Sequence, residues 1–261
     1  MSLRLPRYSP LLIAALVLVI AALLPKSVFA GLDWVGYAVC HRIPQRSFII
    51  NQSQLPVCAR DTGMFSGVLL GLLYFASVLP TKAAQFPRKS LLLLLGLSFV
   101  AWGFDGFNSY LQLLRGEPLL YEPRNWLRLT TGAWMGVSLS VFVVALFNQA
   151  VWREQSEFAP VQQAKDILWL WLIAIAIILI VLWQAPFLYG PIALTSALGV
   201  LVLLSIVNGL ILLLARKRHN QITRWVELLP YLALGLGLCV AEIAGIDLAR
   251  RALTASLGLP F

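Results

Sequence analysis

Long apolar stretches separated by short polar segments dominate the chain. Seven such stretches of about twenty residues contain few charged side chains. They cover approximately residues 10–30, 63–80, 90–114, 128–148, 166–185, 192–215 and 228–249. A helix rises 1.5 Å per residue, so about 20 apolar residues cross a hydrocarbon core of about 30 Å, where backbone groups must pair within the segment. The pattern therefore predicts an all-α fold, a polytopic transmembrane helical bundle of about seven spans.

Composition supports this class and excludes others. Of the 261 residues, 60% are apolar and 12% are charged, which is about half the charged fraction of an ordinary soluble domain. Neither heptad repeats nor strict alternation occur, and this excludes a coiled coil and an outer-membrane barrel. Sequence motifs for nucleotide binding and for serine hydrolysis do not occur either, so neither chemistry is expected.

The first stretch has two interpretations. Arg4 and Arg7 precede an apolar core at residues 11–24, and the small residues that signal peptidase accepts end at Gly31. Lys26 and the long multi-span chain that follows favour an uncleaved first helix instead. Cleavage would leave six spans.

The stretches divide the chain into three regions. Residues 1–30 form a first transmembrane helix or signal-like segment, residues 31–148 a motif-bearing membrane region with a Cys/His loop, and residues 149–261 a C-terminal three-helix membrane region. Basic loops stay in the cytoplasm. Eleven of the twenty Lys and Arg residues lie in segments predicted on the same side of the membrane as the N-terminus. With Arg4 and Arg7 before the first span, this predicts an inner-membrane protein with a cytoplasmic N-terminus and the Cys/His loop outside. The basic residues behind the net charge of +9 are interpreted as setting the orientation in the membrane and contacting membrane lipids, so no nucleic-acid partner is expected.

The Cys/His loop concentrates the groups that carry chemistry. Two of the three cysteines, one of the two histidines and three arginines lie within about twenty residues. Three interpretations are open for them. Cys40 and Cys58 form a disulfide, which stabilises a loop of this length by about 3 kcal/mol. Alternatively, Cys40, His41, Cys58 and Asp61 bind zinc or another transition metal. In the third interpretation, a neighbouring cation lowers the pKa of a thiol, which acts as a nucleophile or redox centre. Cys239, inside the last stretch, is expected to be a buried apolar side chain.

Four motifs along residues 36–140 resemble a known family. They are Cys-His-x-x-Pro-x-Arg-Ser-Phe at 40–48, Pro-Val-Cys-Ala-Arg at 56–60, Asp-Gly at 105–106 and Arg-Leu-x-Thr-Gly at 128–132. Their order resembles the prokaryotic integral membrane proteins of the domain of unknown function 2085. Members typically have Cys-Ala-Arg-Cys-Thr-Gly where this chain has Cys-Ala-Arg-Asp-Thr-Gly. The resemblance implies a four-ligand metal site in which Asp61 replaces sulfur by oxygen, or a site that has lost its metal here.

Two carboxyl groups lie inside predicted spans. Asp105 and Glu242 are each about 22 Å from the predicted cytoplasmic end of their span. An ionised side chain in hydrocarbon costs about 2.5–3.5 kcal/mol, so such groups usually face a partner or a cavity. Asp105 is therefore expected to form a structural ion pair with Arg60 or Arg128, or to serve as a substrate or proton site or as a metal ligand.

Arginines in the two outer loops suit a negatively charged ligand, because guanidinium groups bind phosphate or carboxylate through two hydrogen bonds. The residues expected to hold such a group are Arg42, Arg46, Arg60, Arg124, Asn125 and Arg128. We expect an outward-facing, metal- or thiol-dependent site that acts on or binds a small or lipid-borne anionic ligand at the outer leaflet. Asp105, Arg60 and Arg128 are its expected catalytic residues, with Glu242 beside them. The alternatives are a proton-coupled transporter and a non-catalytic subunit of a membrane complex.

Overall fold

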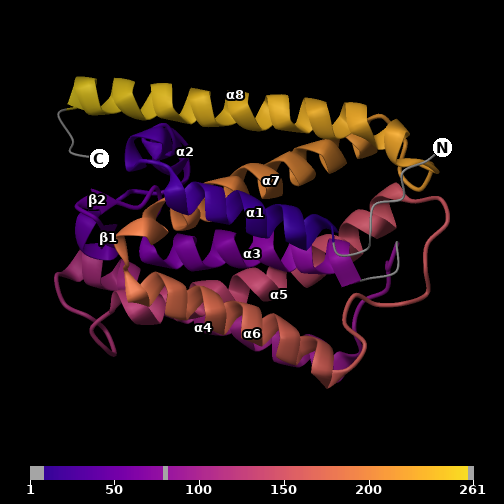
Figure 1. Cartoon of the computed structure of the whole chain (residues 1–261), viewed down its shortest axis with the longest axis horizontal. Coiled ribbons are helices and arrows are strands. Elements are labelled where there is room, and N and C mark those ends of the chain that lie inside the picture. The colour runs from indigo at the N-terminus through magenta and orange to yellow at the C-terminus, as the bar shows by residue number, and fades with distance from the viewer. Residues whose placement is uncertain (1–8, 79–81, 258–261) are drawn as a thin grey trace.

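The computed structural model describes residues 9–78 and 82–257 and consists mainly of helices (Figure 1). These helices are α1 (Ser9–Leu23), α2 (Leu32–Val39), α3 (Ala59–Val78), α4 (Lys89–Arg115), α5 (Asn125–Val151), α6 (Ala164–Trp183), α7 (Tyr189–Ala215) and α8 (Trp225–Leu257). Strands β1 (Ile49–Ile50) and β2 (Ser53–Gln54) pair as one antiparallel hairpin. Short 3-10 turns cover Lys26–Phe29, Pro44–Arg46 and Pro186–Leu188. The prediction of an all-α, polytopic helical bundle is confirmed.

Six of the described helices, α3 to α8, are long and apolar enough to cross a membrane. The predicted first span at 10–30 is shorter than expected. Helix α1 has 15 residues, which at 1.5 Å per residue is about 22 Å, and a 3-10 turn follows it from Lys26. Pro25 stands between the two and lacks the amide hydrogen that a longer helix would require.

Helices α3 and α5 form the centre of the bundle. In their most apolar segments 44% and 61% of the residues are buried, against 17% for α4. Glycines allow the two backbones to touch, because a Cβ added at Gly132 would lie 2.1 Å from the carbonyl oxygen of Arg60. One turn further, a Cβ at Gly136 would lie 2.1 Å from the oxygen of Met64. Small residues spaced by four have this role in membrane helix pairs, and here they fix the first turn of α3 against the first turn of α5.

One end of the bundle, called the loop end here, carries most of the polar structure. It contains α2, the β1–β2 hairpin, the first turns of α3 and α5 and the last turns of α4 and α8, and Figure 1 shows α2 and the hairpin there at left. The hairpin turn places Asn51 and Gln52 at φ values of 50° and 59°, as a type I′ turn requires. The Cys/His loop is therefore a folded cap over the loop end.

Candidate functional site

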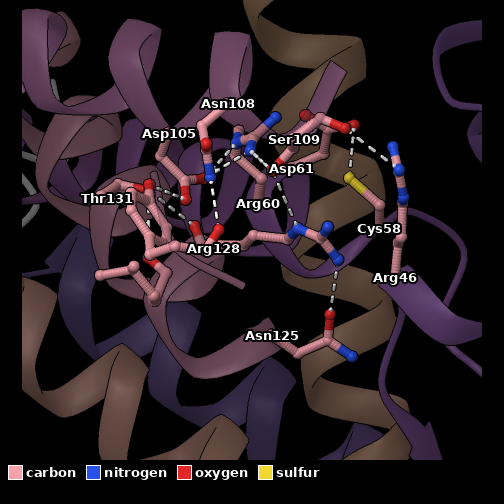
Figure 2. Close-up of polar contacts among 12 residues, drawn as sticks. Arg46, Cys58, Arg60, Asp61, Asp105, Asn108, Ser109, Asn125, Arg128 and Thr131 are labelled. Atoms are coloured by element: carbon pink, nitrogen blue, oxygen red, sulfur yellow. Dashed lines mark hydrogen bonds and ion pairs between the residues drawn. The ribbon is translucent and has the colours of Figure 1, made fainter. Parts of the chain in front are cut away.

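A cluster of polar side chains lies between the helices at the loop end. We call it the polar cluster, and its members are Arg46, Arg60, Asp105, Asn108, Ser109, Tyr121, Asn125 and Arg128. Of the α4 members, Asn108 and Ser109 lie three and four residues after Asp105, so all three share one helix face. Arg60 and Arg128 lie in the first turns of α3 and α5, so the glycine contact between those helices brings them together. Figure 2 shows these side chains converging.

Asp105 is an anchor of the polar cluster. It is 1% exposed and forms an ion pair with Arg60, whose Nε donates to Oδ2 at 3.1 Å and whose second guanidinium nitrogen also donates to this oxygen. The Tyr121 hydroxyl donates to Oδ1 at 2.8 Å. The carboxylate therefore has a cation and a hydroxyl as partners, and Arg60 is the nearer of the two arginines that the sequence suggested.

Hydrogen bonds of Tyr121 and Asn108 hold the segment after α4 beside Asp105. Asn108 donates to the Tyr121 carbonyl at 2.8 Å and accepts the amide of Leu120 at 3.1 Å. Desolvation raises the pKa of Tyr121 to about 12, and the hydrogen bond to Asp105 acts in the same direction. Sequence reasoning missed Tyr121, because only the bend after α4 brings it beside a span.

Two arginines of the polar cluster lack a carboxylate partner among the described residues. Arg128 is 4% exposed and donates from Nε to the Ser109 hydroxyl at 3.4 Å and from Nη1 to Asn125 Oδ1 at 3.1 Å. Arg46 donates to the Ser109 carbonyl at 3.1 Å. Burial lowers the pKa of Arg46, and the charge of Arg60 lowers it further. The polar cluster thus contains three guanidinium groups, of which Asp105 pairs only with Arg60.

A second group, here called the thiol cluster, consists of Cys40, Cys58 and Asp61. Their ligand atoms lie within 4.8 Å of one another. Cys40 follows α2 directly, while Cys58 and Asp61 are three residues apart at the start of α3. The Cys40 sulfur accepts the amide hydrogen of Cys58 at 3.2 Å, and the Cys58 thiol donates to Asp61 Oδ2 at 3.2 Å. Figure 2 shows Cys58 and Asp61 beside Arg46 and Arg60.

The two thiols are both free in the structure and differ in acidity. Interaction with the Cys58 thiol lowers the pKa of Cys40, whereas burial acts against it. The same interaction raises the pKa of Cys58, and burial raises it further.

Four of the residues expected at the site lie outside both clusters. His41 is exposed and does not join the thiol cluster; the backbone at Cys40 is extended, with φ −137° and ψ 148°, and successive side chains on extended backbone point to opposite sides. Arg42 pairs with Asp33 at 2.8 Å. Arg124 is exposed, and Glu242 accepts a hydrogen bond from Asn208 of α7 at 2.9 Å rather than facing the polar cluster.

Arg250, near the end of α8, makes an unexpected contact with the thiol cluster. It donates to the carbonyl oxygen of Cys40 at 3.0 Å and also to that of Tyr37. Its guanidinium lies 4.2 Å from the centre of the Tyr37 ring. Asp247, three residues earlier on α8, does not pair with Arg250, and both of its carboxylate oxygens are buried without a hydrogen-bond partner among the described residues.

These features define a class: a polytopic membrane protein with a buried cluster of charged side chains and an adjacent thiol cluster at one end of its bundle. The chain belongs to the family described as "Predicted membrane protein (DUF2085)", whose model matches residues 40–142. That segment contains every residue of the two clusters. Arg250 lies outside it.

Two archaeal relatives match the same part of the chain. An uncharacterised protein of Methanothermobacter thermautotrophicus is 34% identical over 108 residues, which are 41% of this chain and 86% of that protein. An uncharacterised protein of Methanocaldococcus jannaschii is 27% identical over 116 residues, 44% of this chain and 68% of that protein. No solved structure matches the chain.

Proposed function

We propose that this membrane protein binds a small or lipid-borne anionic group in the polar cluster, next to a metal or thiolate in the thiol cluster. One observation carries the proposal. Arg46 and Arg128 both donate to Ser109, and neither forms an ion pair with a described carboxylate.

The electrostatics of the polar cluster favour an anion. A buried charge is strongly destabilising unless a counter-charge and hydrogen bonds compensate it. Asp105 compensates Arg60, and Arg128 has only the neutral acceptors of Ser109 and Asn125. A phosphate or carboxylate accepts two parallel hydrogen bonds from a guanidinium, so such a group would supply the counter-charge for Arg46 and Arg128.

The thiol cluster suits zinc. Two thiolates and a carboxylate are zinc ligands with bond lengths of about 2.0–2.3 Å, so the atoms now within 4.8 Å would move together by about 1 Å. Three protein ligands leave a fourth position for water or for the anion, as in catalytic zinc sites. A bound zinc would supply Lewis-acid chemistry there. With the predicted orientation, both clusters lie near the outer leaflet of the inner membrane.

Anion binding is tested with inorganic phosphate and, for a lipid headgroup, with dihexanoyl phosphatidylglycerol. Hydrogen bonds to charged groups contribute about 1.5–3 kcal/mol, so Arg46→Gln should weaken binding at least about ten-fold. Arg124→Gln is the matched control because Arg124 is exposed and outside the polar cluster. Isothermal titration of the detergent-purified protein measures the affinity of each variant for the anion. Equal affinities in the two variants would contradict the proposal.

Metal binding is tested by elemental analysis of the purified protein before reduction. Zinc near one ion per chain should be lost in Cys58→Ser and retained in Cys239→Ser, because Cys239 is buried in α8 away from the thiol cluster. If the wild-type protein contains no metal and zinc titration finds no site, the metal proposal fails. The thiolate alternative then predicts that iodoacetamide alkylates Cys40 or Cys58 faster than Cys239, which is fully buried.

A further inference from the structure

A second site lies at the end of the bundle opposite the loop end. A cavity of about 450 Å³ is lined by apolar side chains of α3, α5, α7 and α8. Its volume falls within the range of ligand sites. Among the described residues that line it, Lys82 is the only charged side chain and Asn148 the only other strongly polar one.

The charge of Lys82 is available to a ligand. Its ammonium nitrogen lies 5.0 Å from the centre of the Trp152 ring, and it forms no ion pair with a carboxylate of the described residues. The Asn148 amide already has hydrogen-bond partners: its nitrogen donates to the Ala83 carbonyl at 2.8 Å, and its oxygen accepts the Trp152 indole hydrogen at 2.9 Å. Among the described residues, the cavity therefore combines an apolar wall with one cation, Lys82, that has no carboxylate partner.

The position of this cavity indicates where a ligand would come from. It lies between the last turns of α3 and α5 and the first turns of α8, at an end of the membrane spans. Trp225 lines it, is 55% exposed and stacks with Phe147 at 6.3 Å. Tryptophans of this kind mark the level of the lipid headgroups, so the apolar wall faces acyl chains and Lys82 lies near their phosphates.

We propose that this cavity binds one acyl chain of an anionic phospholipid, with the lipid phosphate at Lys82. The apolar wall accepts the chain, and the ammonium group selects the charged headgroup over a zwitterionic one. The site is independent of the function proposed for the loop end, because it shares no residue with either cluster.

Native mass spectrometry of the detergent-purified protein tests the proposal with phosphatidylglycerol and phosphatidylcholine of identical chains. A single lysine near a membrane surface changes the affinity for an anionic lipid about five-fold. Lys82→Gln should therefore weaken binding of the first phosphatidylglycerol molecule by this factor and leave the affinity for phosphatidylcholine unchanged. Lys89→Gln is the control, since Lys89 is an exposed lysine at the same end and does not line the cavity. It should bind both lipids as the wild type does.

A variant that fills the cavity tests the acyl-chain part. Ala76 lines the cavity and is exposed, so Ala76→Phe adds volume there without entering the packed core. This variant should weaken binding of the first molecule of either lipid. The proposal is overturned if Lys82→Gln and Lys89→Gln lose affinity equally, if the wild type binds the two lipids equally, or if Ala76→Phe retains wild-type affinity.

Discussion

Removing the Asp105 carboxylate should destabilise the protein far more than removing the carboxylate of the more exposed Arg42–Asp33 ion pair. The side chains of Arg60 and Asp105 are 17% and 2% exposed, whereas those of Arg42 and Asp33 are 22% and 40% exposed. Breaking a buried pair leaves an uncompensated charge and costs about 3–5 kcal/mol, against about 0–1 kcal/mol for an exposed pair. Asp105→Asn should therefore lower the free energy of unfolding by about 3–5 kcal/mol, and Asp33→Asn by less than about 1 kcal/mol.

A double variant separates the charge effect from loss of packing. Replacing a buried pair by apolar residues of similar volume is often neutral or stabilising, so Arg60→Met combined with Asp105→Leu should recover most of the stability that Asp105→Asn loses. Unfolding in mixed micelles of increasing SDS fraction, followed by circular dichroism, measures all of the variants. If Asp105→Asn loses no more stability than Asp33→Asn, then Asp105 is not a buried anchor and the reasoning is refuted.

Three further predictions concern other features of the fold. In an alkaline absorbance titration, one phenol should ionise at about pH 12 and be missing in Tyr121→Phe; its raised pKa means that native stability falls as pH rises from about 10 to 12. Gly136→Ala should destabilise the protein by about 1–3 kcal/mol in thermal melts because its Cβ would meet backbone, whereas Gly96→Ala, with open space, should not. In a cysteine-free background, a membrane-impermeant maleimide added to intact cells should label Gln45→Cys but not Lys217→Cys, and the reverse result would invert the predicted orientation.

The sequence was sufficient for the features that depend on local periodicity. Six of the predicted spans are long helices in the structure, because bilayer thickness sets the length of an apolar span. The stretch at 10–30 contains a shorter helix, α1, which ends before Pro25. Cys58 and Asp61 were expected in one site, and their spacing of three residues places the Cys58 thiol within hydrogen-bond distance of the Asp61 carboxylate. Arg60 was one of two arginines expected beside Asp105, since both lie at ends of neighbouring spans.

The remaining features depend on loop conformation and on helix arrangement, which periodicity does not encode. His41 is adjacent to Cys40 in sequence, yet the extended backbone at Cys40 points the two side chains to opposite sides and leaves His41 exposed. Glu242 was expected beside Asp105 from equal depth alone, but depth does not specify which helices are neighbours, and α8 packs on α7. Tyr121 joins the polar cluster through a bend whose shape is set by contacts with Asn108.

The contact between Arg250 and Cys40 affects how the protein is made. The two residues are 210 positions apart, so at a synthesis rate of about 5–20 residues per second the ribosome needs about 10–40 s to progress from one to the other. Throughout that interval the backbone around Cys40 lacks its last hydrogen-bond donor. The loop that carries the thiol cluster therefore reaches its final hydrogen bonding only after α8, the last span, has been made.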